Sequence, residues 1–240
     1  MAGHCIYSWI HTSRPVSDNT EIYSICGFSC RKRVCVFKID LRGNGDSEGE
    51  PGGAYYSSDY VIDALNAYSA LESAGFIDKN KIGLWGHSMA GNVVMRAFAV
   101  KPAIPAVVIW AGAGYTYKDL ADFRLRDASY MPQPSDSERQ KKRQKLREVY
   151  GEPKDGNPFW DSIAPSSYLK DLKGAIQLNH SVDDNVVSVE YSRNLNKLLD
   201  ETSVPHELHE YQGGGHNIND PYFTDAMKNT VDFFNTYLKK

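Results

Sequence analysis

The sequence has no apolar run that approaches the roughly 18 residues needed to cross a membrane. It also has no excess of basic residues, because its 27 lysines and arginines are outnumbered by 30 aspartates and glutamates. Without a basic field there is little to attract nucleic acid or anionic lipid. We therefore expect neither a nucleic-acid nor a membrane partner. Residues 1–10 lack the pattern of a signal peptide, so the expected location is cytoplasmic.

Cysteine is scarce, and all of it lies near the start of the chain. The spacing of the 4 cysteines matches no common zinc pattern, so we expect no metal site: Cys5, Cys26, Cys30 and Cys35. With 41% hydrophobic and 24% charged residues, the composition is that of an ordinary globular protein. The length predicts a single domain over 1–240, in which residues 1–35 form an atypical N-terminal segment.

Short apolar runs alternate with helical patterns from residue 34 onward. This alternation is typical of an α/β protein in which helices cover both faces of a parallel sheet. A helix is predicted over 56–75, and another over 220–240, where Asp220 is expected to cap the helix and Pro221 to take its first position. The nearly continuous apolar runs predict buried strands at 34–40, 81–86, 105–112, 175–181 and 206–212.

Residues 113–170 separate two predicted strands by more chain than a simple crossover needs, which predicts a helical cap or lid. Its helix is expected to begin at a Ser135–Glu138 capping box and to end at Gly151. The basic run within 139–147 fits an anionic partner or a solvated helix face, and the slightly acidic chain favours the second. The cap aromatics are expected to line an acyl pocket or to pack the cap onto the core: Tyr115, Tyr117, Phe123, Tyr130, Phe159 and Trp160.

Ser88 lies in the stretch GLWGHSMAG, between a predicted strand and a predicted helix. A strand that turns into a helix within a couple of residues forces strained backbone angles on the corner residue and requires small neighbours. Gly86, Ala90 and Gly91 meet that requirement. The corner would expose the Ser88 hydroxyl and place the Met89 amide at a helix N-terminus, where developing negative charge is stabilised. Ser88 is therefore the candidate nucleophile, and the Met89 N–H is the candidate oxyanion donor.

A candidate acid and base follow Ser88 in the order that such a site requires. A serine hydroxyl is a poor nucleophile unless an imidazole accepts its proton, and the imidazole needs a carboxylate to fix its tautomer. His216 lies in the glycine-rich stretch YQGGGHNI after the last predicted strand. Asp183 and Asp184 follow the preceding strand, and both are open as the acid. Of the other histidines, His87 is expected to point away from the serine, and His180 to shape the acid loop.

At these motifs the chain resembles the α/β-hydrolase superfamily, and within it the serine hydrolases similar to prolyl oligopeptidase and dienelactone hydrolase. The stretches that carry the resemblance are DLRGNGDSEG, GHSMAG, HSVDDNVVSVEYS and GGGHN. In such relatives the acid loop reads His-Gly-x-x-Asp-x-x-Val-Pro, and a serine follows the acid by eight positions. His180 and Ser192 have this spacing from Asp184, so the resemblance implies Asp184 as the acid. The implied fold is a mostly parallel central sheet flanked by helices, with the helical cap inserted between late strands.

The segment before residue 35 departs from the resemblance. Relatives carry a His-Gly dipeptide upstream of the DLRG loop, and an amide beside it supplies the second oxyanion donor. This chain has YSWIHTSRPVS there instead. A shifted reading of the codons for residues 8–14 permits His-Gly-Tyr-Ile-Pro-Pro, so we hypothesise that residues 5–35 come from a frameshifted reading frame. The first strands are then incomplete or non-native, although HCIYSWI is apolar enough to pair as a strand.

The resemblance implies hydrolysis of an ester or amide through an acyl-enzyme, without a cofactor. We expect a carboxylesterase that acts on small or medium acyl esters, with Ser88 as nucleophile and His216 as base and then acid. Asp184 would orient His216, and the Met89 N–H would hold the oxyanion. Two alternatives stay open. One is an aminopeptidase or acyl-peptide hydrolase acting on short peptides, and the other is a catalytically impaired, hydrolase-like binding protein.

Overall fold

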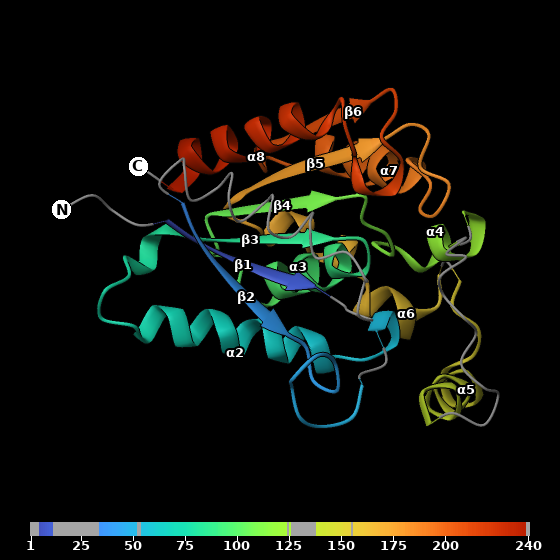
Figure 1. Cartoon of the computed structure of the whole chain (residues 1–240). Helices are drawn as coiled ribbons and strands as arrows, with labels where there is room; N and C mark the ends of the chain where they lie inside the picture. The colour runs from blue at the N-terminus through green and yellow to red at the C-terminus, as the bar shows by residue number, and fades with distance from the viewer. Residues whose placement is uncertain are drawn as a thin grey trace.

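The computed structural model describes residues 5–11, 34–51, 54–123, 125, 138–154 and 156–238, with the backbone alone for 5–11, 34, 35, 138–140 and 142. These residues form a six-stranded sheet of order β2-β1-β3-β4-β5-β6, in which every neighbouring pair is parallel (Figure 1). The predicted parallel sheet is confirmed. Its strands are β1 (Cys5–His11), β2 (Val34–Asp40), β3 (Ile82–His87), β4 (Ala106–Trp110), β5 (Ala175–Ser181) and β6 (His206–Tyr211).

Helices connect the strands from β2 onward. The helix predicted over 56–75 is confirmed as α2. The cap and first position predicted for the last helix are wrong, because Tyr222 N–H closes a turn onto the carbonyl of Asn219 and the helix begins only after it. The described helices are α2 (Asp59–Ser73), α3 (Met89–Val100), α4 (Tyr117–Asp122), α5 (Glu138–Tyr150), α6 (Pro158–Ile163), α7 (Glu190–Asp200) and α8 (Phe223–Leu238). The short 3-10 turns are η1 (Ala54–Tyr56), η2 (Lys79–Lys81), η3 (Pro165–Asp171) and η4 (Gly215–Asn217).

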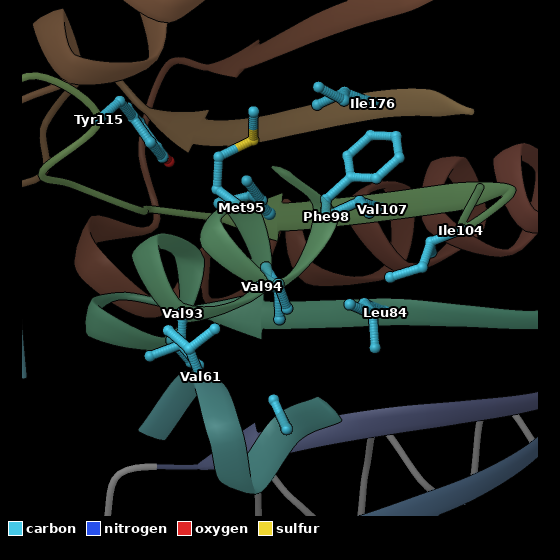
Figure 2. Close-up of a cluster of buried hydrophobic side chains, with 14 of the residues drawn as sticks. Val61, Leu84, Val93, Val94, Met95, Phe98, Ile104, Val107, Tyr115 and Ile176 are labelled. Carbon is cyan, nitrogen blue, oxygen red and sulfur yellow. The ribbon is translucent and has the colours of Figure 1, made fainter. Parts of the chain in front are cut away.

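Both faces of the central strands are buried. Val107 of β4 lies in a cluster with Phe98 of α3 (Figure 2). The next residue, Val108, lies in a separate cluster with Phe234 of α8. Successive side chains of a strand point to opposite faces, so β4, which is buried on both faces, is apolar at every position. This is why β4 is recognisable in the sequence as a continuous apolar run.

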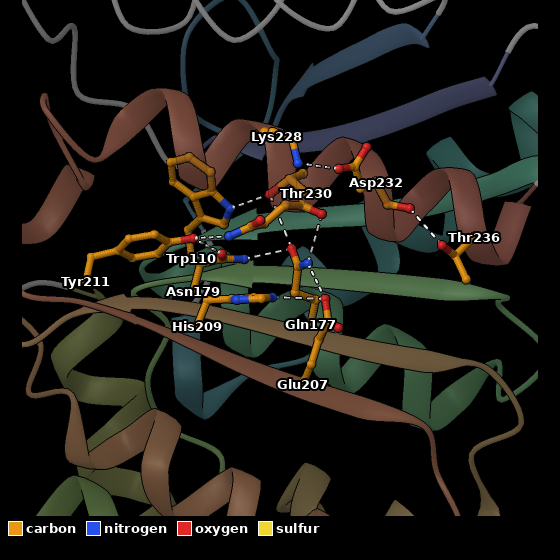
Figure 3. Close-up of polar contacts among 11 residues, drawn as sticks. Trp110, Gln177, Asn179, Glu207, His209, Tyr211, Lys228, Thr230, Asp232 and Thr236 are labelled. Carbon is orange, nitrogen blue, oxygen red and sulfur yellow. Dashed lines mark hydrogen bonds and ion pairs between the residues drawn. The ribbon is translucent and has the colours of Figure 1, made fainter.

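A polar network joins β4, β5 and β6 to α8 (Figure 3). Asn179 Nδ2 donates to Gln177 Oε1 at 2.8 Å, and the hydroxyl of Tyr211 donates to Asn179 Oδ1 at 2.8 Å. The indole N–H of Trp110 donates to Thr230 Oγ1 at 3.0 Å. Buried polar groups that satisfy one another in this way favour a single arrangement of the strands. Because Tyr211 ends β6, the network fixes the point at which the glycine-rich loop begins.

The chain between β4 and β5 forms α4, α5, α6 and η3 where it is described, and α5 lies at the outer end of this segment (Figure 1). Tyr117 and Trp160 are 8% and 0% exposed, with ring centroids 4.7 Å apart, and Trp160 meets Tyr56 edge to face at 5.9 Å. Tyr115 is also fully buried. The three aromatic side chains from this segment, Tyr115, Tyr117 and Trp160, therefore pack it onto the core. A lid function for the segment stays a prediction.

The helix stop predicted at Gly151 is confirmed, since α5 ends at Tyr150 and Gly151 has a φ of +79°. Phe159 is half-buried and stacks on Tyr150, with the ring centroids 3.6 Å apart. Tyr130 and the capping box at Ser135 lie outside the described residues.

The strand expected within HCIYSWI is confirmed, and it occupies an inner position. β1 pairs with β2 on one side and with β3 on the other. Residues 12–33 lie outside the described residues, so YSWIHTSRPVS, where the second oxyanion donor is expected, is described only up to His11, as backbone of β1. Within the described ranges, no helix has both the length and the apolar character needed to cross a membrane.

Candidate active site

Ser88 occupies the corner between β3 and α3, with φ +57° and ψ −124°. Residues other than glycine rarely adopt these φ and ψ values, so the backbone at the corner is strained. It is held on both sides, because the Ser88 N–H donates to the Trp110 carbonyl and the Ser88 carbonyl accepts from the Gly91 N–H, each at 2.9 Å. A Cβ on Gly86 would lie 2.5 Å from the carbonyl oxygen of Ala90, which explains the need for glycine. The Ser88 side chain makes no capping hydrogen bond to α3, so its hydroxyl is not tied to that helix.

Met89 is the first residue of α3. Its N–H therefore belongs to the first turn, whose N–H groups have no partner within the helix. The positive end of the helix dipole lies at the same place. An oxygen that gains negative charge beside Ser88 would be stabilised there.

Asp184 is a buried carboxylate in the loop after β5, and both of its oxygens are engaged. Oδ1 accepts the backbone N–H groups of Val186 and Val187 at 2.8 and 2.9 Å, and Oδ2 accepts from His216 Nδ1 at 2.8 Å. Burial by itself raises the pKa of Asp184, but hydrogen bonds from His180 and His216 and the charge of His216 outweigh it. The net effect holds the pKa of Asp184 well below its usual range, so the carboxylate is ionised at neutral pH.

His180 is fully buried behind Asp184 and shapes the acid loop, as expected. Its Nε2 lies 3.0 Å from the carbonyl oxygen of Val187 and 3.2 Å from Asp184 Oδ2. Since these oxygens can only accept, Nε2 carries the hydrogen, and Nδ1 accepts from the Ser192 hydroxyl at 2.7 Å. The spacing that singled out Ser192 in the sequence thus corresponds to a direct contact.

Asp183 and Asp184 bind different parts of the same loop. Asp183 Oδ1 accepts the backbone N–H of Gly215 at 2.9 Å, whereas Asp184 binds the imidazole of His216. Of the two carboxylates, which the residues alone left open as the acid, only Asp184 has a hydrogen bond to the His216 ring among the described contacts. Asp184 as the acid stays a prediction.

His87 contacts His216, a contact that was not expected from the sequence. It is the last residue of β3, directly before Ser88, and its Nε2 lies 2.9 Å from the backbone oxygen of His216. The ring centroids of the two histidines are 4.7 Å apart. The only signal in the sequence was a second histidine beside the candidate nucleophile. The path of the distant loop, which decides the contact, leaves no local pattern.

The three candidate residues follow β3, β5 and β6, whose carboxyl ends meet at one edge of the parallel sheet. The hydrogen bond between Asp184 and His216 joins two of them directly. His87, adjacent to Ser88 in the chain, connects the third to the His216 loop. With Nδ1 of His216 bound to the carboxylate, Nε2 is the ring nitrogen that can accept a proton.

The parallel sheet, its covering helices and the strained serine corner between β3 and α3 define the chain as an α/β-hydrolase fold protein. The chain belongs to the family described as BAAT / acyl-CoA thioester hydrolase C terminal, whose model matches residues 65–239. The family is a hydrolase family, and the match includes Ser88, Asp184 and His216.

A curated relative matches a shorter part of the chain. Polyketide transferase claH of Penicillium crustosum is 27% identical over 85 residues, which are 35% of this chain and 28% of that protein. The match therefore spans less than a third of the relative.

Solved structures match nearly the whole chain. Est1E from Butyrivibrio proteoclasticus, solved with ferulic acid bound, has a TM-score of 0.70 and 17% identity, and the match covers 100% of this chain and 90% of Est1E. Dipeptidyl peptidase 4 from Porphyromonas gingivalis has a TM-score of 0.68 and 15% identity, covering 98% of this chain and 31% of that one. Acetyl xylan esterase 1 from Thermoanaerobacterium has a TM-score of 0.62 and 14% identity, covering 97% and 76%. At such identities the likeness establishes the shared fold.

Proposed function

We propose that the protein is a serine hydrolase that cleaves carboxylic esters through an acyl-enzyme. The observation that carries the proposal is the 2.8 Å hydrogen bond from His216 Nδ1 to Asp184, at the sheet edge where Ser88 forms a strained corner. Membership of a hydrolase family supports it.

The first step of the proposed reaction is attack by Ser88 Oγ on the acyl carbonyl carbon. His216 Nε2 accepts the hydroxyl proton as the new bond forms. The resulting imidazolium is stabilised by Asp184, whose low pKa keeps it ionised, and the Nδ1 hydrogen bond fixes the tautomer that leaves Nε2 free to accept. The Met89 N–H donates to the carbonyl oxygen as it becomes negative.

The tetrahedral intermediate then collapses. The bond from the acyl carbon to the leaving oxygen breaks, and His216 returns its proton to the departing alcohol. Water then attacks the acyl carbon, with His216 again as base. The bond from the acyl carbon to Ser88 Oγ breaks, His216 returns the proton to Oγ, and the carboxylic acid and free Ser88 are released. Each step uses groups already described, and none requires a cofactor.

The proposed substrates are small or medium acyl esters. Est1E was solved with ferulic acid, and another similar structure is an acetyl xylan esterase, which supports an oxygen ester. The family description names acyl-CoA thioesters, so a thioester substrate is the second candidate. The same residues would serve it, because a thiolate needs less help to leave than an alkoxide. An aminopeptidase is the third, supported by the similarity to dipeptidyl peptidase 4.

Turnover of three matched substrates separates these candidates. The full chain is assayed with p-nitrophenyl butyrate, butyryl-CoA and alanine p-nitroanilide, and Ser88→Ala is the control for background hydrolysis. We expect kcat/KM to be highest for the nitrophenyl ester. Faster turnover of the thioester or of the anilide would replace the ester assignment. Absence of all Ser88-dependent turnover would favour the binding-protein alternative.

A further inference from the structure

Two side chains hold the main chain around His216, one on each side of this residue. On one side Asp183 Oδ1 accepts the N–H of Gly215 at 2.9 Å. On the other side the carbonyl of His216 accepts from His87 Nε2–H at 2.9 Å. The chain that enters this peptide is glycine-rich, and Gly214 and Gly215 have φ values of +102° and +60°. Such a segment has little backbone preference of its own, so its position depends on contacts such as these, on the hydrogen bond from Ser181 Oγ to the Gly213 carbonyl and on the Asp184 bond.

The contact from His87 differs from that of Asp183 because His87 belongs to a strand of the sheet and not to a loop. It is the last residue of β3, an inner strand paired with β1 and β4, and its chain neighbour is Ser88. The N–H of Ser88 is itself bound to the Trp110 carbonyl of β4. The hydrogen bond from His87 therefore ties the His216 loop to the corner that carries Ser88, and so fixes the position of the loop relative to the nucleophile.

We propose that His87 is a positioning residue, whose Nε2–H sets the His216 imidazole at the distance from Ser88 that proton transfer needs. This inference rests on the proposed function. The Asp184 bond fixes the tautomer and one point of the ring, and the His87 bond fixes the main chain behind it. Misplacing a catalytic group by about 1 Å can cost on the order of 10²-fold in rate, so the effect is measurable.

The ring of His87 also packs against its neighbours, so the donor and the ring must be separated. Its centroid lies 6.3 Å from that of Trp85, with the planes 16° apart, and 4.7 Å from that of His216. His87→Phe keeps an aromatic ring and removes the N–H. His87→Gln loses the ring and keeps an N–H donor near the position of Nε2. If the hydrogen bond matters, Phe is the damaging substitution and Gln restores function.

Rates of fluorophosphonate labelling at Ser88 and ester kinetics test the proposal. We expect His87→Phe to lower the labelling rate and kcat roughly 10- to 100-fold, with KM and Tm nearly unchanged, and His87→Gln to recover most of the loss. In a His216→Ala background, His87→Phe should cause no further loss. His206→Phe is the matched control, because His206 also donates to a backbone carbonyl, that of Val204 at 2.8 Å, but at the opposite end of its strand. Equal losses in the Phe and Gln variants, or no loss in either, would overturn the proposal.

A second measurement does not need an active serine. Hydrogen–deuterium exchange of residues 212–219 is followed in Ser88→Ala protein with and without the His87 substitutions. His87→Phe should speed exchange in this loop, whereas His87→Gln should leave it near the parental rate. Unchanged exchange with Phe would overturn the inference about His87. Wild-type protein that is not labelled at Ser88 would instead overturn the serine hydrolase proposal, so the two failures are distinguishable.

Discussion

Nδ1 of His216 lies 2.8 Å from Oδ2 of Asp184, whose other oxygen accepts two backbone N–H groups. These two hydrogen bonds hold the orientation of the carboxylate that the imidazole contacts. Fixing the acid in this way lets one hydrogen bond determine both the tautomer and the orientation of the base.

Asparagine substitutions at the two adjacent aspartates should have very different effects. Asp184→Asn presents an amide to His216 and favours the wrong tautomer, so kcat should fall by about 10³- to 10⁴-fold. Asp183→Asn keeps an oxygen that can accept the Gly215 N–H, so its loss should be much smaller. Ester kinetics of both variants provide the measurement. A larger loss in Asp183→Asn than in Asp184→Asn would reverse the assignment of the acid.

Asp184 should also make stability depend on pH in acid. Its pKa is depressed in the folded protein relative to about 3.9 for an unfolded aspartate, so its contribution is fully present above that value. The contribution is lost as the pH falls toward the folded-state pKa, because the unfolded chain binds the proton first and is stabilised relative to the folded protein. The difference in Tm between wild type and Asp184→Asn should be constant above about pH 5 and should shrink below about pH 4. A difference that does not change with pH would contradict the depressed pKa.

Gly86 should tolerate no side chain. A Cβ there would lie 2.5 Å from the Ala90 carbonyl oxygen and 2.9 Å from a methyl group of Val94. Gly86→Ala should destabilise the fold by roughly 1–3 kcal/mol and lower activity by shifting the Ser88 corner. Gly75→Ala is the control, because a Cβ there meets nothing within 4 Å. Urea unfolding and ester kinetics provide the readouts, and equal behaviour of the two variants would count against this account of the corner.

Most of the sheet could be predicted because its signal is local. The central strand β4 is apolar throughout because both of its faces are buried. The predicted bounds 34–40 and 175–181 match β2 and β5 residue for residue, but β2 is an edge strand with exposed residues, so the buried strand predicted there is wrong on burial. The start of α8 was mispredicted, since the capping chemistry of Asp220 and Pro221 competes with a turn that forms around them. Local preference cannot decide between two such arrangements when packing determines the outcome.

In the candidate site, too, local features could be predicted from the sequence and long-range contacts could not. The small residues around Ser88 are a local requirement of the corner and are visible in the sequence. The contact from His87 to the His216 carbonyl joins residues 129 positions apart, and it depends on how a glycine-rich loop returns over the sheet. Nothing in the sequence near either residue encodes that path.

The most direct test of the central claim is fluorophosphonate labelling of the full chain, with the modified residue identified by mass spectrometry. The account predicts a single adduct on Ser88, no labelling of Ser88→Ala, and labelling of His216→Ala that is slower by at least about 10³-fold. Folded wild-type protein that stays unlabelled, or Ser88→Ala that is labelled at the wild-type rate, would contradict it.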